Sequence, residues 1–292
     1  GEVFLRPDFR EIFEEVSRMG LLVQIYTNGT MITPEVIRWL GRTPPFKVSI
    51  TLYGASRDTY QKVTGFADGY DRAVRAVDGL TAAGIAVQMK TTIIRDNVCD
   101  FDRLLRLFDE RKIKLGLIDY IAPRREGSCS DPQDCRLTPR ELVEFRKHVV
   151  NIWRQKENRL KSEPDGDDDC QSPGAPKENA AGDSAHAFRC SAGRSSFFIT
   201  WDGVMTPCNV MDQPSVSVLD RNLPEVWEEL KRKCSLVPVC DECGQCIYRN
   251  SCASCPAKLF RETGCFDKAA PYLCETTRLE LEELQADSER VV

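Results

Sequence analysis

The residues best suited to chemistry in this 292-residue chain are its 14 cysteines, most of which lie near the C-terminus. The densest stretch contains two Cys-x-x-Cys pairs, Cys243 with Cys246 and Cys252 with Cys255. Thiolates two residues apart can bind one metal centre from a single turn, so two adjacent pairs are a strong indication of a metal site. Three more cysteines complete the pattern: Cys190, Cys208 in Gly203-x-x-x-x-Cys208, and Cys274.

The spacing alone leaves the metal open. A zinc ion would be satisfied by the four cysteines of the two pairs, but Cys190, Cys208 and Cys274 would then have no role. Iron-sulfur clusters also take four cysteines each, and two clusters would use nearly all of these thiols. The pattern therefore favours iron-sulfur clusters and keeps zinc as the alternative.

Composition sets the wider limits. With 41% hydrophobic residues, 29% charged residues and a net charge of −5, the chain is typical of a soluble globular protein. The mild acidity argues against a nucleic-acid partner. The first twenty residues carry charges throughout, and no apolar run is long enough to span a bilayer, so we expect neither a signal peptide nor a membrane association. Clustered thiols in such a chain indicate metal binding in a reducing cytoplasm rather than secreted disulfides.

The first 157 residues alternate between strand and helix patterns. Helices are expected at 8–20, 33–42, 56–64, 70–84, 100–111 and 138–156, and strands at 21–27, 47–54, 86–94 and 115–121. Strands separated by helices predict βαβ units and a parallel sheet. Ligand sites are then expected at the carboxyl ends of the strands.

The remaining residues follow a different pattern. Residues 158–187 are rich in Pro, Gly, Ser, Asn and Asp, which predicts a linker or loop. A hairpin is expected at 195–208, with Phe197, Phe198 and Trp201 in the core of a small domain, followed by a helix near 222–233. The expected domains are thus 1–157, a linker at 158–187, a cysteine-rich domain at 188–275 and a tail helix at 276–292.

The cysteine order resembles the seven-cysteine SPASM domain that ends many radical SAM enzymes, although two residues rather than three separate Cys252 from Cys255. The resemblance implies two auxiliary 4Fe-4S clusters. The first would be held by Cys190, Cys208 and Cys255, and the second by Cys243, Cys246, Cys252 and Cys274. Seven thiolates are one short of eight, so the first cluster has an open iron unless Cys234, Cys240 or Cys265 supplies the fourth ligand.

The first 157 residues are similar to the radical SAM barrel. Gly1-Glu2 resembles the end of the Gly-Gly-Glu segment, Thr27-Asn28-Gly29-Thr30 resembles the turn after the third barrel strand, and Ser49 resembles the polar residue of the fourth. The resemblance implies that Gly1, Glu2, Thr27, Asn28 and Ser49 bind S-adenosyl-L-methionine (SAM). The implied fold is α/β: a partial (β/α)6 barrel followed by a small cysteine-rich α+β domain.

The Cys-x-x-x-Cys-x-x-Cys loop that holds the SAM-binding cluster in this family does not occur in these residues. We therefore expect an N-terminally truncated fragment whose third 4Fe-4S cluster belongs to a missing part. The implied function is modification of a peptide or protein substrate by radical hydrogen abstraction, with a reducing electron donor as a further partner. An anaerobic sulfatase-type maturase is a narrower possibility. A non-catalytic iron-sulfur electron carrier or a zinc-binding interaction module is the alternative from another class. No catalytic residue is identified.

Overall fold

The computed structural model describes residues 2–124, 134–162 and 187–289, so Gly1 and most of the expected linker lie outside the described residues. The chain packs as two units, Gly1–Ile121 and Ala122–Val292, which are described separately. The packing boundary precedes residue 157, because the helix after residue 138 packs within the second unit. In the described ranges, no helix combines the length and the apolar character needed to cross a membrane.

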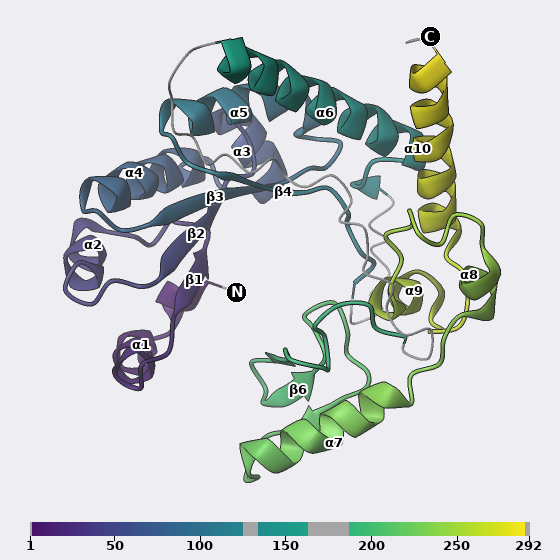
Figure 1. Ribbon diagram of the computed structural model, residues 1–292. Coiled ribbons are helices and arrows are strands. Elements are labelled where there is room, and N and C mark those ends of the chain that lie inside the picture. Colours follow the sequence, from purple (N-terminus) through teal and green to yellow (C-terminus); the bar gives the residue numbers. More distant parts are fainter. Residues whose placement is uncertain (1, 125–133, 163–186, 290–292) are drawn as a thin grey trace. The chain divides into compact units, whose positions relative to one another are not determined.

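The first unit is built on a four-stranded parallel sheet, as the alternating pattern predicts (Figure 1). Its strands follow chain order: β1 (Gln24–Thr27), β2 (Lys47–Thr51), β3 (Val87–Thr92) and β4 (Leu115–Ile118). The register pairs Tyr26 with Ser49 and Ser49 with Gln88. The prediction of a parallel α/β fold is confirmed.

Helices lie before and between these strands and cover one face of the sheet. They are η1 (Val3–Leu5), α1 (Phe9–Arg18), α2 (Pro34–Leu40), α3 (Arg57–Thr64), α4 (Gly69–Ala82), η2 (Val98–Asp100) and α5 (Phe101–Glu110). The core joins Val48, Ile50 and Met89 of the sheet to Leu40 of α2 and Leu80 of α4, all of them buried. Burial of this apolar surface is the main source of the unit's stability.

Strand β1 is shorter than the 21–27 range expected from hydrophobicity. Its ladder begins at Gln24, opposite Lys47, and Leu22 is 81% exposed. Gly20 adopts a left-handed conformation (φ 80°) at the end of the preceding turn, and pairing starts only where β2 offers a partner. Apolar character alone therefore overestimated the length of the strand, because a strand needs a hydrogen-bonding neighbour.

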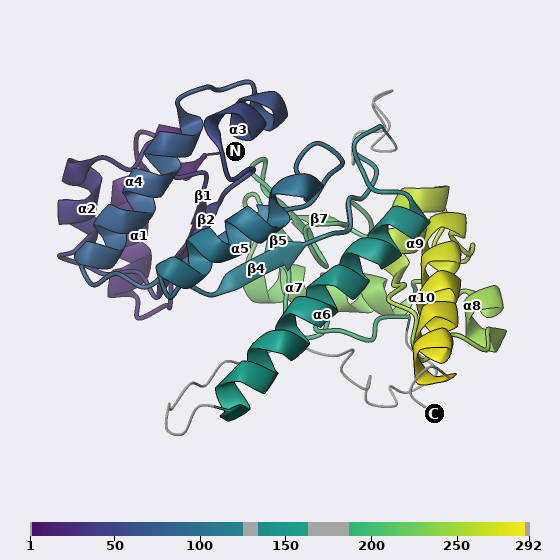
Figure 2. The same cartoon turned by 90° about the horizontal axis from the view of Figure 1, so that it is seen from above.

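The second unit contains two long helices that pack together, α6 (Pro139–Ser162) and α10 (Pro271–Glu289) (Figure 2). Helix α10 begins before the expected residue 276, so Cys274 lies in its first turn. Arg136 and Glu262 form a buried, two-point ion pair within this unit, with distances of 2.7 and 3.2 Å. The Arg136 guanidinium also lies 3.8 Å from the centroid of the Tyr272 ring.

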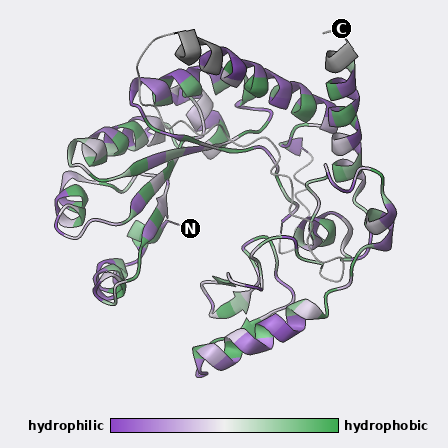
Figure 3. Ribbon diagram, in the orientation of Figure 1, coloured by the Kyte–Doolittle hydropathy of each residue, from purple (hydrophilic) through white to green (hydrophobic). Residues whose placement is uncertain are grey.

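The rest of this unit is a small α+β assembly around the cysteines. Its elements are β5 (Phe198–Ile199), β6 (Val204–Thr206), β7 (Val216–Ser217), α7 (Leu223–Ser235), α8 (Asp241–Gln245) and α9 (Pro256–Thr263). The expected antiparallel hairpin is present as β5 and β6. Figure 3 shows hydrophilic and hydrophobic residues on different sides of α7, whose buried residues include Val226 and Leu230.

The prediction that the hairpin aromatic residues fill this core is wrong. Trp201 is 96% exposed, and Phe197 and Phe198 are also exposed. Trp201 lies in the turn between two very short strands, where its side chain has no facing layer. The core is formed instead by other residues, among them Phe188, Met205 and Met211.

Candidate cofactor and metal sites

Glu2 joins the start of the chain to the carboxyl end of β1. One carboxylate oxygen, Oε1, accepts a hydrogen bond from Thr27 Oγ1 at 2.7 Å. The other, Oε2, accepts one from the backbone N of Asn28 at 2.8 Å. Three of the residues expected at the SAM site, Glu2, Thr27 and Asn28, are therefore brought together at the end of a parallel strand, where α/β sheets bind ligands.

The turn after β1 is held by its own side chains. Asn28 Oδ1 accepts hydrogen bonds from the backbone N of Thr30 at 2.8 Å and from Thr30 Oγ1 at 2.7 Å. Gly29 has φ +77°, and a Cβ built there would lie 3.1 Å from Ile50 Cγ2. Only glycine adopts this conformation readily and leaves room for the sheet. The turn sequence thus fixes the backbone that faces Glu2.

Ser49, the fourth described residue expected at the SAM site, belongs to a separate polar network on the face of the sheet. It is fully buried; its Oγ accepts from Gln24 Nε2 at 2.8 Å and donates to Gln88 Oε1 at 3.2 Å. Next to this network, Lys90 Nζ lies 4.3 Å from the centroid of the Tyr26 ring. This side of the sheet is therefore polar, opposite the face that packs on the helices.

Sequence reasoning missed Gln24, Gln88 and Lys90, although a signal was available. Polar residues alternate with apolar ones along β1, β2 and β3, and successive strand residues point to opposite faces. It also missed Asn97, which is fully buried and whose Nδ2 donates to the carbonyl oxygens of Tyr53 at 3.0 Å and Thr92 at 2.9 Å. Asn97 thereby links the loops that follow β2 and β3.

In the second unit, one cavity of about 530 Å³ is lined by four of the expected metal ligands. They are Cys243 and Cys246 around α8, Cys252 in the loop before α9, and Cys274 in the first turn of α10. These are the four cysteines that the family resemblance assigns to the second auxiliary cluster. A donor set of four thiols around one cavity suits a 4Fe-4S cluster.

The electrostatic environment of these thiols shows that they are close to one another. Burial raises the pKa of Cys274, and the charges of Cys252, Cys246 and Cys240 raise it further. Burial also raises the pKa of Cys243 to about 12, with a contribution from its hydrogen bond with Cys240. Thiols in this state are neutral at pH 7, and they bind metal by releasing their protons.

Three expected ligands remain: Cys190, Cys208 and Cys255. Burial raises the pKa of the Cys255 thiol, and the charges of Cys208 and Cys190 raise it further. Both Cys208 and Cys255 pack against the small hydrophobic core of this unit. Across the described part of the chain, no three His, Cys, Asp or Glu side chains stand in the geometry of metal ligands. The structure thus gathers four expected ligands at one cavity without closing them around an ion.

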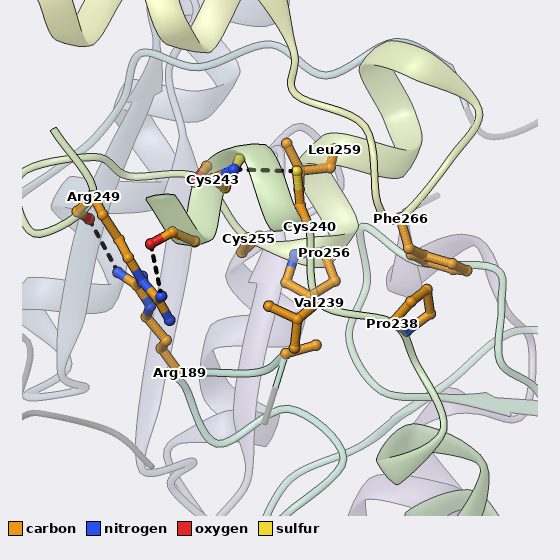
Figure 4. Close-up of a pocket in the computed structure, with 13 residues that line it drawn as sticks. Arg189, Pro238, Val239, Cys240, Cys243, Arg249, Cys255, Pro256, Leu259 and Phe266 are labelled. Carbon is orange, nitrogen blue, oxygen red and sulfur yellow. Dashed lines mark hydrogen bonds between the residues drawn. The ribbon is translucent and has the colours of Figure 1, made fainter. Parts of the chain in front are cut away.

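A smaller cavity, of about 40 Å³, lies where Cys240, Cys243 and Cys255 approach one another (Figure 4). Cys240 Sγ accepts a hydrogen bond from the backbone N of Cys243 at 3.5 Å. Arg189 Nη1 donates to the carbonyl oxygen of Arg249 at 3.1 Å, and both arginines line this cavity. Two cations beside the thiols would favour their thiolate forms when a metal is bound.

The chain is similar to several known proteins. Residues 1–108 match the family model described as the radical SAM superfamily. The chain is 24% identical over 290 residues to the AdoMet-dependent heme synthase of Methanosarcina barkeri, covering 93% of this chain and 80% of the relative. It is 38% identical over 108 residues to mycofactocin maturase MftC of Mycobacterium tuberculosis, covering 37% of this chain and 27% of the relative.

Solved structures give the same fold. Streptococcus suis SuiB bound to S-adenosylmethionine superposes with a TM-score of 0.69 at 15% identity, over 94% of this chain and 64% of SuiB. The enzyme anSMEcpe bound to AdoMet and the Kp18Cys peptide gives a TM-score of 0.66 at 15% identity, over 96% of this chain and 81% of that chain. The family match confirms the predicted radical SAM enzyme class and its use of SAM with a 4Fe-4S cluster.

Proposed function

We propose that this chain is part of an enzyme that modifies a peptide or protein by radical hydrogen abstraction and carries two auxiliary 4Fe-4S clusters in a SPASM-type domain. The observation that carries the proposal is the cavity lined by Cys243, Cys246, Cys252 and Cys274, in a unit that also contains Cys190, Cys208 and Cys255. The substrate class is supported by the peptide bound to anSMEcpe and by the similarity of the chain to a PqqA peptide cyclase.

The residues of the first unit hold the SAM site in this proposal. Glu2 orders the turn at Thr27 and Asn28, which presents backbone groups at the end of β1. Ser49 of β2 is buried between Gln24 and Gln88, and its hydroxyl orients their amide groups on the polar face of the sheet. When bound, SAM and its cluster supply the radical that abstracts hydrogen; the protein binds the cofactor, orients it and limits its access to water.

The residues of the second unit hold the auxiliary clusters. Cys243, Cys246, Cys252 and Cys274 would bind one, and Cys190, Cys208 and Cys255 the other. Such clusters supply one-electron transfer, and their potentials depend on burial and on hydrogen bonds to the sulfur atoms. Thr277 is placed to donate a hydrogen bond to a ligand sulfur, because its Oγ1 lies 3.4 Å from Cys252 Sγ.

Metal analysis tests the cluster assignment. The full-length gene product, purified without oxygen, is expected to hold about eight auxiliary iron atoms per chain, with matching sulfide, on the stoichiometry of two cubanes. Replacing Cys274 by alanine should remove about four of them. The control is Cys99→Ala, which changes an exposed cysteine of the first unit. A colourless protein that binds only zinc would contradict the proposal and favour the interaction-module alternative.

A haem precursor is the second candidate substrate, because heme synthases align with nearly the whole chain. Lys90 adds a cation on the polar face of the sheet, which suits the carboxylates of such a precursor. The two substrates are separated by incubating the enzyme with SAM and a reductant, together with either a peptide pool or an iron porphyrin. Deoxyadenosine formation coupled to a peptide mass change supports the first, and coupling to a porphyrin mass change supports the second.

A further inference from the structure

We propose that Cys234 is the fourth protein ligand of the first auxiliary cluster, beside Cys190, Cys208 and Cys255. The inference rests on the proposed function, since it names the thiol that completes one of its two clusters. Four thiolates close a cubane and leave no free iron position. This cluster therefore transfers electrons and does not anchor the substrate.

The helix that carries Cys234 directs it into the core of the second unit. Val226, Leu230 and Cys234 follow one another at intervals of four along α7 and are all buried, so they share the inner face of the helix. Cys234 is only 6% exposed and belongs to the same hydrophobic core against which Cys208 and Cys255 pack. Three of the four thiols are thus attached to one small core.

Gly193 shows where the Cys234 thiol lies relative to the other ligands. A Cβ built at Gly193 would be 2.5 Å from Cys234 Sγ and 3.7 Å from Pro207 Cβ. Gly193 is three residues after Cys190, and Pro207 immediately precedes Cys208. The Cys234 thiol therefore contacts the loop that follows Cys190, at the point where that loop meets the segment leading to Cys208. The missing side chain at Gly193, which has φ +66°, leaves room for this contact.

The two other candidate cysteines fit this position less well. Cys240 Sγ accepts a hydrogen bond from the backbone N of Cys243, which ties it to a ligand of the second cluster, although the cavity that it lines is also lined by Cys255. Cys265 is exposed and follows the end of α9, where its backbone N donates to Thr263 Oγ1 at 3.1 Å. A buried cysteine can also serve only as a small apolar core residue, so the experiment must separate ligation from packing.

The test measures iron, sulfide and the electron paramagnetic resonance (EPR) spectrum of the anaerobically purified full-length protein. Cys234→Ala should lose up to about four iron atoms per chain, or give the signal of a 3Fe-4S form after mild oxidation. Cys265→Ala, the matched control, should keep the iron content and the spectrum of the unsubstituted protein. Retention of the second cluster's iron in Cys234→Ala shows that the unit has folded.

A second variant moves the thiol without removing it. Gly193→Ala introduces a Cβ against Cys234 Sγ and should give the same spectral change as Cys234→Ala. Gly264→Ala is its control, because Gly264 also has positive φ (+75°) but no atom within 4 Å of an added Cβ. The proposal is overturned if Cys234→Ala keeps all its iron and an unchanged spectrum, or if Cys240→Ala alone opens the first cluster. In contrast, an unsubstituted protein without iron would refute the proposed function itself.

Discussion

Glu2 and Asn28 are separated by 25 residues in the sequence, yet Glu2 Oε2 accepts a hydrogen bond from the Asn28 backbone N at 2.8 Å. Because Glu2 Oε1 also accepts from Thr27 Oγ1, a single carboxylate fixes the turn at the carboxyl end of β1. The proposed SAM site thus depends on a contact between the beginning of the chain and its first strand.

Replacing Glu2 by Gln should weaken SAM binding. The amide oxygen can keep the hydrogen bond from the Asn28 N–H, but the amide NH2 would face Thr27 Oγ1, which no longer donates to a carboxylate and already accepts from the backbone N of Gly29 at 3.0 Å. Loss of one hydrogen bond to a charged group corresponds to about 1.5–3 kcal/mol, or roughly a tenfold to hundredfold rise in the SAM dissociation constant. Titration calorimetry with SAM measures this dissociation constant. Glu11→Gln, at an exposed position of α1, is the control, and equal affinities in the two variants would contradict the proposed role.

Replacing Thr277 by Val should lower the reduction potential of the cluster proposed at Cys252. A hydrogen bond to a ligand sulfur stabilises the more negative, reduced state, so its removal favours oxidation. Thr276→Val is a closely matched control, because both threonines are buried on α10 and both hydroxyls donate to a backbone carbonyl oxygen four residues earlier, Tyr272 at 2.8 Å and Leu273 at 3.0 Å. The Thr277 hydroxyl shares its proton with Cys252 Sγ at 3.4 Å. EPR-monitored redox titration compares the two variants. Equal shifts would mean that the change acts through helix packing and not through the sulfur atom.

The first unit should lose stability at alkaline pH because of Tyr60. Burial, with smaller contributions from Tyr53 and Glu2, raises the pKa of Tyr60 from 10.0 to about 12. The unfolded chain therefore releases this proton near pH 10, while the folded chain keeps it until about pH 12. The stabilisation is complete below pH 10 and is lost as the pH rises to 12, amounting to roughly 3 kcal/mol.

Denaturant unfolding at pH 9 and at pH 11.5, monitored by a probe in the first unit, measures this effect. Tyr60→Phe keeps the ring, which packs edge-on against Tyr53 at 6.0 Å, and removes the ionisable group. The alkaline loss should be smaller in the variant than in the unsubstituted chain. An identical pH dependence would show that other groups are responsible.

Breaking the ion pair between Arg136 and Glu262 should destabilise the second unit strongly. Both side chains are 7% exposed, so Arg136→Met leaves the Glu262 carboxylate buried without its guanidinium partner. Such a change costs about 3–5 kcal/mol, whereas replacing both residues by apolar ones is often much less harmful. Arg278→Met is the control, because its pair with Glu282 is exposed. The test compares the denaturant unfolding of Arg136→Met, of the double variant Arg136→Met with Glu262→Leu, and of Arg278→Met. Arg136→Met is expected to be the least stable of the three.

The sequence by itself determined the parallel α/β class and the closeness of the paired cysteines. Both follow from local information: the alternation of strands with helices sets the sheet topology, and short spacings such as Cys243 to Cys246 keep thiols together in any compact fold. It also predicted the turn at Thr27 and Asn28, because the Asn-Gly pair requires a local conformation that few other residues adopt.

Tertiary structure decided what depends on contacts between distant segments. Glu2 meets Asn28, Ser49 meets Gln24 and Gln88, and Cys234 meets Gly193 only because separate elements pack together. The start of β1 and the exposure of Trp201 also differed from the sequence-based expectation. A strand needs a neighbour and a core side chain needs a facing layer, and neither requirement is visible in a local pattern of hydrophobicity.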